Sequence, residues 1–437
     1  MTRSLHILLA TIEYPPQPFS SGIGSYTKAV AEGLAARGHR VRVLTRGTER
    51  NAVDTIEGVT VEYVVPTRAE LPKDQSNTFA MAALGLRGLA GEIRYRRRLA
   101  NRIHDLVARH GYDLVEAADH LGEAAWYDPA RHPGVPFVVR LHTPMTYSER
   151  VERNVPGWVT AVVATQERRQ ARHATHLSSP SATMVAPFLD ALHARDRHVH
   201  VFPNPNLSTL GAAAPTPDPA GPPVVLFVGR LTGWKGVDTL MRAVPHVLRR
   251  HPDTRFQLLG GDTGPCHGYA SYRAYLESLL PDSVRHSVEF LGKVQQEELA
   301  SFYRRATVCV FPSRFDVLPY TCLEAMNYGK AIIGSSTSGM RDMLDDGAAG
   351  LLHHPPDVDD LAENIVSLLD DPGLRVRLGS RAFDRARSVL SVGAALDATE
   401  EFYLRAIDDL RARPMSPART ARPAAQAGAR LASGDRT

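Results

Sequence analysis

The sequence has few cysteines and no long apolar run. Its three cysteines, Cys266, Cys309 and Cys322, show neither an even count nor the spacing of a metal site, so they favour a reducing cytoplasm over a disulfide-linked secreted fold. No run approaches the roughly 18–20 apolar residues of a transmembrane helix. The apolar stretch near the N-terminus is soon interrupted by Glu13 and prolines, so it predicts a strand rather than a signal peptide. We therefore expect a cytoplasmic protein without an integral membrane segment.

The excess of positive charge is confined to the C-terminal tail. The whole chain has a formal net charge of +4, and the five arginines and single aspartate of residues 413–437 account for all of it. The remaining body is formally neutral, which gives no support for nucleic-acid binding. The tail is rich in Ala, Pro, Gly and Arg without periodicity and predicts a disordered basic segment.

The length predicts two domains. A chain of 437 residues is too long for one ordinary core. Residues 205–222 are dominated by Pro, Ala, Thr and Ser, a composition typical of a linker. We therefore place a first domain at 1–204 and a second at 223–391, with a terminal helix at 392–412.

Both halves begin with the same pattern. In the first half a buried strand at 5–10 is followed by a loop with Gly22 and Gly24, a helix, and a second strand at 41–45. In the second half a strand at 223–229 is followed by a short turn and a helix. This order predicts an α/β fold with two Rossmann-like doubly wound parallel sheets. Glycines at a helix start let backbone N–H groups approach a phosphate.

The stretch 308–329 contains the clearest candidate site. It predicts a buried strand at 308–311, a loop with Asp316, and a helix from Tyr320 with Glu324 in or near its first turn. The free N–H groups of the helix start can bind a diphosphate, and the two carboxylates can accept hydrogen bonds from sugar hydroxyls. The alternative is an ordinary strand–helix unit in which both acids are solvated.

Three further residues suit the same chemistry. Arg230 and Lys235 flank one short turn after a predicted strand, where two cations can neutralise a diphosphate. His142 ends a predicted strand at 136–142, and ligands bind outside the carboxyl ends of such strands. A hydrogen-bonded structural histidine is the alternative at that position.

A run of arginines lies in predicted helices at 79–110. It comprises Arg94, Arg96, Arg97 and Arg98. A basic amphipathic helix can lie on an anionic membrane, but the bulky aromatics expected on a membrane-seeking face are nearly absent. We expect a solvated helix face.

Two motifs resemble those of a known enzyme family. The pattern Asp316-x7-Glu324-Ala-Met is similar to the donor-binding signature of the retaining glycosyltransferases of family 4, which have the GT-B fold. Gly-Arg-Leu-x3-Lys-Gly at 229–236 matches a second element, and the Val-Phe-Pro-Asn segment ending at Asn204 a third. Asp316 departs from the glutamate usual at its position. The resemblance covers about residues 5–412 and is more specific in the second half.

The resemblance implies a fold and a set of roles. It implies two domains facing a central cleft, with residues 392–412 crossing back to the first domain. His142 and Asp316 would contact the donor sugar, Glu324 the ribose, and Arg230 and Lys235 the leaving diphosphate. The expected catalytic residues are therefore His142, Arg230, Lys235 and Asp316, without a metal. The expected donor-binding residues are Gly22, Gly24, Arg230, Lys235, Lys293, Val294, Asp316, Pro319, Tyr320, Thr321 and Glu324.

The implied function is retaining transfer of a hexose from a UDP- or GDP-linked sugar to a small polar acceptor in bacterial natural-product biosynthesis. Assembly of a cell-envelope saccharide or glycolipid is an alternative acceptor class. A nucleotide-sugar epimerase, a phosphorylase or a non-catalytic nucleotide-sugar-binding subunit is an alternative of another kind. A pyridoxal-dependent phosphorylase would need a cofactor lysine, which the sequence does not identify. We expect no cofactor beyond the nucleotide-sugar substrate, and self-association as a homodimer stays open.

Overall fold

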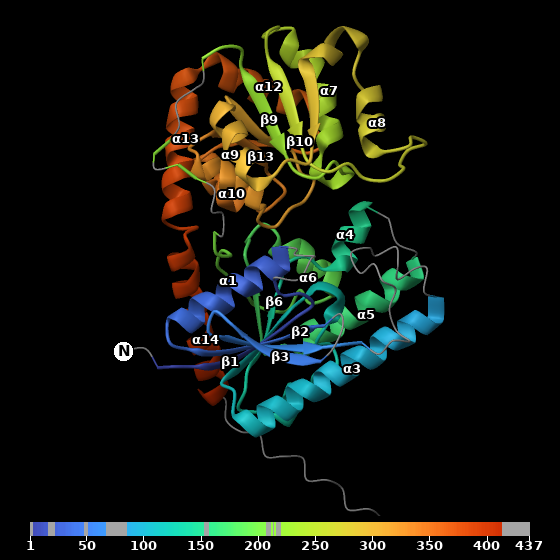
Figure 1. The fold of residues 1–437 in the computed structure, drawn as a ribbon, viewed down its shortest axis with the longest axis vertical. Coiled ribbons are helices and arrows are strands. Elements are labelled where there is room, and N and C mark those ends of the chain that lie inside the picture. The colour runs from blue at the N-terminus through green and yellow to red at the C-terminus, as the bar shows by residue number, and fades with distance from the viewer. Residues whose placement is uncertain are drawn as a thin grey trace, which may run out of the picture.

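The computed structural model of the chain describes residues 3–15, 22–47, 51–66, 85–152, 157–206, 211–212, 214–215 and 220–412. They form two α/β units, each built on one sheet, which lie one above the other in Figure 1. The tail at 413–437 and several positions of the predicted linker lie outside the described residues.

The first sheet has eight strands in the order β3-β4-β2-β1-β5-β6-β7-β8. All neighbours pair parallel except β3 and β4, which are antiparallel at one edge. The sequence did not predict β3, because most side chains of this edge strand are exposed and it has no apolar alternation. The strands are β1 (His6–Thr11), β2 (Arg40–Arg46), β3 (Ala52–Ile56), β4 (Val59–Val64), β5 (Leu114–Ala118), β6 (Phe137–Arg140), β7 (His176–Ser179) and β8 (Val199–Val201).

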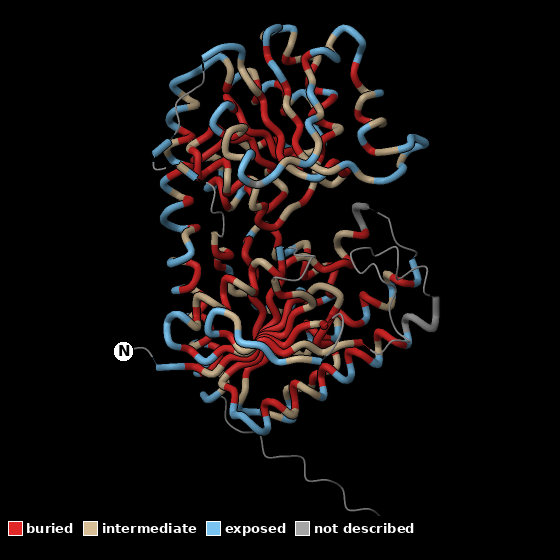
Figure 2. The backbone as a smooth tube through the Cα atoms, viewed as in Figure 1, coloured by how far each residue is buried: buried red, intermediate tan, exposed pale blue. Residues whose placement is uncertain are grey.

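Helices cover both faces of this sheet, and the strands between them are buried (Figure 2). One face packs against α3, α5 and α6, and the other against α1. The helical elements are α1 (Gly22–Ala36), α3 (Gly85–His110), η1 (His120–Gly122), η2 (Pro129–Arg131), α4 (Met145–Glu152), α5 (Gly157–His173) and α6 (Val185–Leu192).

The second sheet has six parallel strands in the order β11-β10-β9-β12-β13-β14. The order reverses between β9 and β12, so the loops after these two strands diverge and leave room for a ligand at their carboxyl ends. The strands are β9 (Val224–Val228), β10 (Arg255–Leu259), β11 (Val288–Gly292), β12 (Val308–Phe311), β13 (Ala331–Ser335) and β14 (Leu351–His353).

Helices also cover both faces of the second sheet. One face packs against α7, α8 and α12, and the other against α9, α10 and α13. The helical elements are η3 (Gly233–Lys235), α7 (Val237–Leu248), α8 (Tyr272–Ser278), η4 (Asp282–Ser287), α9 (Gln296–Arg305), α10 (Tyr320–Asn327), α11 (Met340–Met343), η5 (Asp345–Gly347), α12 (Val358–Asp370) and α13 (Pro372–Arg387).

The last helix, α14 (Val392–Ala412), returns to the first unit (Figure 1). Its buried side chains join the core formed by β1 and α1. At its surface Arg37, the residue after α1, pairs with Glu400 at 3.2 Å. The chain therefore passes between the units twice, once before β9 and once between α13 and α14. Among the described residues, no helix combines the length and the apolar character needed to cross a membrane.

The two units also touch through loops at the carboxyl ends of their strands. Asp342 of α11 accepts hydrogen bonds from the Ser181 hydroxyl (2.5 Å) and from the backbone N–H and hydroxyl of Thr183 (both 3.0 Å). Ser181 and Thr183 follow β7, and Asp342 lies in the short helix after β13. The carboxyl edges of the two sheets therefore face the same region of the molecule.

Glu324 is the fifth residue of α10 and so lies just past the first turn, near which it was expected. Two other local expectations are corrected. Gly22 and Gly24 lie inside the first turn of α1 rather than in a loop before it. Arg96 does not lie on a solvated face: its side chain is 1% exposed and is 3.7 Å from the Glu92 carboxylate.

Candidate functional site

The site in the second unit is built around an ion pair between two loops. Lys235 ends η3, which follows β9, and Asp316 lies in the loop after β12. The Lys235 Nζ atom is 2.5 Å from Asp316 Oδ2, and both side chains are largely buried. The adjacent carboxyl ends of β9 and β12 thus bring together a cation and a carboxylate that the sequence predicted as separate contacts.

Gly236 forces the chain into the position that this pair requires. Its φ is +67°, and a Cβ atom there would lie 1.9 Å from the carbonyl oxygen of Pro312. Only glycine fits this left-handed, crowded position without strain. The two loops are further joined because Arg314 pairs with Asp238 at 2.7 Å.

Arg230 lies apart from this pair. Its side chain is exposed, and it forms no hydrogen bond or ion pair with the described residues. The structure therefore joins Lys235 to Asp316 but leaves Arg230 open at the other end of the turn. Lys293 and Val294 follow β11, the edge strand, where Lys293 is exposed and Val294 packs against the core.

Helix α10 begins beside the ion pair. Pro319 is its N-cap residue and provides no side-chain cap. Because first-turn N–H groups have no partner inside a helix, those of Tyr320 and Thr321 remain available to an anion. The Tyr320 hydroxyl is buried without a hydrogen-bond partner among the described residues.

Glu324 lies one turn further along α10. Its Oε2 atom accepts a hydrogen bond of 2.7 Å from the hydroxyl of Tyr303 in α9. Burial raises the pKa of Glu324, and the hydrogen bond from Tyr303 opposes that rise. Tyr303 was not predicted from the sequence, because an aromatic residue on an amphipathic helix gives no sign that its hydroxyl holds a carboxylate in place.

His142 is the site residue of the first unit. It is the second residue after the end of β6, and its backbone N–H donates to Asp119 Oδ1 at 2.8 Å. Its ring meets the edge of Tyr26, a residue of α1, with centroids 4.7 Å apart. Burial, and then the charge of Arg140, lowers the pKa of His142 well below its ordinary value, so the imidazole is neutral. Its Nε2 atom has no hydrogen-bond partner among the described residues.

One buried carboxyl group, Asp119, holds this histidine directly, and a second, Glu167, holds two neighbouring segments. Burial raises the pKa of Asp119 to about 8, and its Oδ2 atom has no hydrogen-bond partner among the described residues. Glu167 of α5 accepts hydrogen bonds from the backbone of Leu121 (3.0 Å) and Met145 (2.7 Å). Asp119 directly follows β5, whereas Glu167 sits inside a helix without any motif that would mark it in the sequence.

A buried polar group connects the site to both crossings between the units. Arg140 donates to the Phe202 carbonyl and to Asn204, each at 2.8 Å, just before the first crossing. Glu116 of β5 accepts from Tyr26 (3.0 Å) and from Tyr403 of α14 (2.9 Å). Side chains of β5 and β6 thus form hydrogen bonds to residues near both places where the chain passes between the units.

The two glycines of α1 have different surroundings. A Cβ atom on Gly24 would lie 3.0 Å from the Glu13 side chain, whereas one on Gly22 would lie 4.0 Å from the Tyr320 ring of the second unit. Gly22 therefore lies near the start of α10, and Gly24 leaves room for Glu13.

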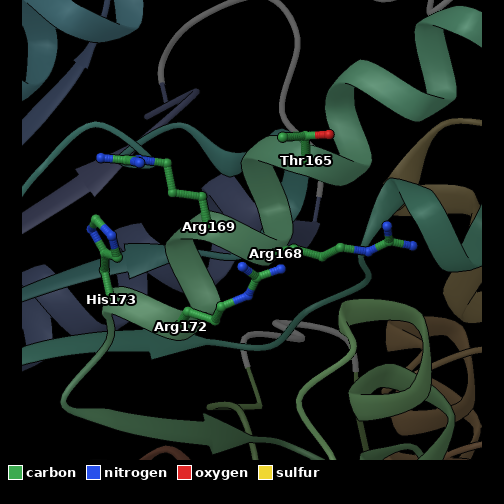
Figure 3. A pocket seen from close by; sticks show the side chains of 5 residues that line it. All are labelled: Thr165, Arg168, Arg169, Arg172 and His173. Carbon is green, nitrogen blue, oxygen red and sulfur yellow. The ribbon is translucent and has the colours of Figure 1, made fainter.

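A separate cavity lies on α5, away from these residues. Figure 3 shows the side chains on the outer face of this helix, and the cavity holds about 260 Å³. The lining residues lie on the solvent-facing side of this helix, whereas Glu167 is buried on its other side. They are Thr165, Arg168, Arg169, Arg172 and His173. Within the described ranges, no three His, Cys, Asp or Glu side chains could hold a metal ion together.

Two family models match the chain in succession. The model described as glycosyl transferase 4-like domain matches residues 21–205, and the model described as glycosyl transferases group 1 matches residues 213–385.

Curated relatives match over almost the full length. The D-inositol 3-phosphate glycosyltransferase of Kineococcus radiotolerans is 30% identical over 433 residues, covering 93% of this chain and 95% of the relative. The glycogen synthase of Mycobacterium tuberculosis is 26% identical over 409 residues, covering 92% and 95%. The alpha-D-kanosaminyltransferase of Streptomyces kanamyceticus is 26% identical over 403 residues, covering 86% and 97%.

Solved structures share the arrangement of the two units. The sucrose-phosphate synthase of Thermosynechococcus elongatus matches with a TM-score of 0.67 at 19% identity, covering 92% of this chain and all of that one. Anabaena HepE in complex with UDP and glucose matches with a TM-score of 0.63 at 18% identity and the same coverage. At such identities the likeness concerns the fold.

Proposed function

Because the chain belongs to the group 1 glycosyltransferases, family 4, with the GT-B fold, we propose that it transfers a sugar from a UDP- or GDP-linked donor to a small polar acceptor with retention of configuration. The observation that supports this most directly is the Lys235–Asp316 pair beside the start of α10. It combines a cation for a diphosphate with a carboxylate for sugar hydroxyls at the point where the strand order reverses.

The ion pair suits a donor that carries both groups. In the absence of substrate Lys235 and Asp316 neutralise each other and hold each other in place. A bound donor would give Lys235 a phosphate oxygen and Asp316 a sugar hydroxyl instead. The N–H groups of Tyr320 and Thr321 and the open side chain of Arg230 would share the diphosphate charge, and Glu324 would bind the ribose.

The proposed reaction breaks the bond between the anomeric carbon and the diphosphate oxygen. The acceptor hydroxyl forms the new bond on the same face, and its proton passes to a donor phosphate oxygen. The products are the glycoside and the nucleoside diphosphate. The chain's residues stabilise the negative charge that grows on the leaving group, which is where preorganised cations and N–H groups accelerate such a step most. No metal or further cofactor is assigned to this step.

Buried polar atoms of the first unit that have no hydrogen-bond partner among the described residues favour a polar acceptor. Asp119 Oδ2, Glu123 Oε1 and His142 Nε2 are buried and have no hydrogen-bond partner among the described residues. Such atoms are costly to leave unpaired, and hydroxyl or amino groups of a substrate could pair with them. An extended lipid chain could not.

The names of the relatives support two different classes of acceptor. Two of the three are named for small molecules, D-inositol 3-phosphate and a kanosaminyl donor group, which supports a role in small-molecule or natural-product glycosylation. The third is named as a glycogen synthase, which supports the saccharide alternative, including cell-envelope assembly. Only the departure of Asp316 from the usual glutamate supports the non-catalytic alternative.

The test uses the purified full-length chain. UDP- and GDP-sugars are screened for binding by thermal shift, then for slow hydrolysis and for transfer to cyclitols, aminocyclitols and oligosaccharides. NMR of the product gives the anomeric configuration. Transfer with inversion contradicts the retaining proposal, and donor binding without hydrolysis or transfer favours the non-catalytic alternative.

A further inference from the structure

We propose that Phe315 and Trp234 are positioning residues that tie the Lys235–Asp316 pair to the first unit, and that Tyr147 of α4 is their partner there. The proposal rests on the proposed function, since it explains how the donor-side pair acquires its geometry. Trp234 occupies an unspecified position of the Gly-Arg-Leu-x3-Lys-Gly element, and Phe315 and Tyr147 lie outside both motifs.

Both chain neighbours of Asp316 are buried in the core of the other unit. Phe315 is 1% exposed and Val317 is 8% exposed. Although their segment follows β12 of the second sheet, both belong to the hydrophobic cluster formed by α3, α5, α6 and the strands of the first sheet. The residues on both sides of Asp316 therefore pack into the core of the first unit, although the loop that carries them belongs to the second unit.

The neighbour of Lys235 is anchored in the same place. Trp234 is partly buried and packs against the same cluster. Its ring centroid lies 5.1 Å from that of Phe315, and Lys235 Nζ lies 5.0 Å from the Trp234 ring. Lys235 and Asp316 thus each directly follow, in the sequence, one of the two rings of the Trp234–Phe315 contact.

In the first unit, Tyr147 packs against Phe315. Its ring meets Phe315 edge-on at 5.3 Å and 85°, and it meets Phe188 of α6 at 5.3 Å and 74°. We call Trp234, Phe315, Tyr147 and Phe188 the aromatic plug. Edge-to-face contacts of this kind favour one relative orientation of the rings.

Backbone hydrogen bonds make the two donor-side loops one rigid piece. The Arg314 N–H donates to the Trp234 carbonyl at 2.7 Å, and the Gly339 N–H donates to the Asp316 carbonyl at 2.7 Å. Gly339 has no room for a side chain, because a Cβ atom would lie 1.6 Å from the Val317 carbonyl oxygen and 3.1 Å from Ser181 Cβ. The Asp342 contact to Ser181 lies beside this crowded point.

The side chain of Asp316 has few contacts of its own. Among the described residues its carboxylate contacts Lys235 at 2.5 Å and the Ser313 hydroxyl at 3.5 Å. Its direction is therefore set mainly by the backbone, and the backbone is set by the aromatic plug. Since α4 lies in the first unit, a change at α4 would reach the donor pair through Tyr147. A misplacement of reacting groups by about 1 Å can cost about 10²-fold in rate.

The experiment combines variants on both sides of the plug with one control. Phe315→Ala and Tyr147→Ala remove one ring each, and Phe315→Leu provides a milder change if Phe315→Ala does not fold. Phe383→Ala removes a ring of similar burial (7% exposed) from α13, outside the plug. Tyr147→Phe keeps the ring and removes only the hydroxyl.

The first measurement does not depend on activity. Hydrogen exchange of backbone amides in 313–318 and 337–342 should rise about tenfold or more in Phe315→Ala and in Tyr147→Ala, and should stay at the wild-type level in Phe383→Ala. Exchange that is unchanged at both segments, in variants that have lost the ring, overturns the proposal.

The second measurement separates positioning from mere stability. In folded Phe315→Ala and Tyr147→Ala, kcat for sugar transfer should fall about 10- to 100-fold, while the Kd of the free nucleoside diphosphate should change less than about threefold. The double variant should lose no more than the worse single variant. Losses that multiply, or a loss of nucleotide affinity as large as that of kcat, overturn the proposal.

The two measurements also keep this inference distinct from the proposed function. If wild-type protein neither binds nor turns over any nucleotide sugar while the exchange results follow expectation, the proposed function fails and the structural coupling stands. If wild-type protein transfers sugar but neither ring substitution changes kcat or exchange, the coupling fails and the function stands.

Discussion

The hydroxyl of Tyr303 is shared between the side chain of Glu324 and the backbone of Thr321. It donates at 2.7 Å to the carboxylate and lies 3.1 Å from the Thr321 carbonyl oxygen. One phenol in α9 thus orients the carboxylate assigned to the ribose and touches the first turn of the helix assigned to the diphosphate. The carboxylate and the first helical turn, proposed to bind the two parts of a nucleotide, thus share one hydrogen-bond partner.

Removing this hydroxyl should weaken nucleotide binding and shift its pH dependence. Tyr303→Phe should lower affinity for the nucleoside diphosphate by about tenfold, since one hydrogen bond to a charged carboxylate contributes about 1.5 kcal/mol. Binding needs ionised Glu324, so affinity falls as the pH drops through its pKa. Burial already raises that pKa and Tyr303 opposes the rise, so in the variant the fall should occur at higher pH. Calorimetry from pH 5 to 8 tests this, and an unshifted profile contradicts it.

Replacing the buried acid beside His142 should change how stability depends on pH. The pKa of Asp119 is raised from 3.8 to about 8, so the folded chain keeps a proton that the unfolded chain releases above pH 4. Wild-type stability from this group is fully present below pH 4 and is lost as the pH rises toward 8. Asp119→Asn keeps an oxygen that can accept from the His142 N–H, and its stability does not decrease with pH through this group. Its free energy of unfolding relative to wild type should therefore rise between pH 5 and pH 8 by at least about 1 kcal/mol. Denaturant unfolding at the two pH values gives the comparison, and equal differences would refute it.

The two cations of the Gly-Arg-Leu-x3-Lys-Gly element should contribute unequally. Lys235→Met removes a buried charge and leaves Asp316 without its partner, so transfer should fall by about 2–4 kcal/mol of transition-state stabilisation. Arg230→Met changes an exposed side chain that has no partner among the described residues, and the loss should be smaller. Steady-state kcat/KM for the donor measures both. A larger loss at Arg230 would reverse the assignment.

The two acids should divide substrate recognition between them. Glu324→Gln removes a charge and turns one acceptor into a donor, so affinity for the free nucleoside diphosphate should fall. Asp316→Asn should reduce turnover and leave that affinity nearly unchanged, because its proposed partner is the transferred sugar. Calorimetry beside transfer rates tests the division, which is wrong if both variants weaken nucleotide binding equally.

Deleting residues after Arg413 should leave melting temperature and transfer rate nearly unchanged. The prediction rests on the composition of the tail, which has too few apolar residues to form a core. Differential scanning calorimetry of the truncated and full-length chains decides it, and a drop of several degrees would show that the tail docks.

The sheets and the family could be predicted from the sequence because their signals are local. Buried parallel strands such as 224–228 are continuous apolar runs, and the turn at Gly236 needs a glycine whatever surrounds it. The edge strand β3 gave no such signal. The helix α13 was not predicted as a separate element either, although Asp371 caps its start by accepting from the Leu374 N–H.

The site could be predicted only as a set of residue types. The sequence placed Lys235 and Asp316 after two strands, but their pairing depends on strand order, which periodicity does not give. Tyr303, Glu167 and the aromatic plug act through contacts between residues far apart in the chain. Such contacts depend on tertiary packing, so no motif marks them.

The return of α14 decides where this chain can be cut and joined. Leu396, Phe402 and Tyr403 fill the core beside β1 and α1, although they follow the entire second unit in the sequence. A hybrid chain that takes its second unit from a relative by exchanging everything after the predicted linker would bring a foreign α14 into the first unit. Functional recombinants should therefore need a second junction, between α13 and α14, so that residues 392–412 stay with the parent that supplied α1.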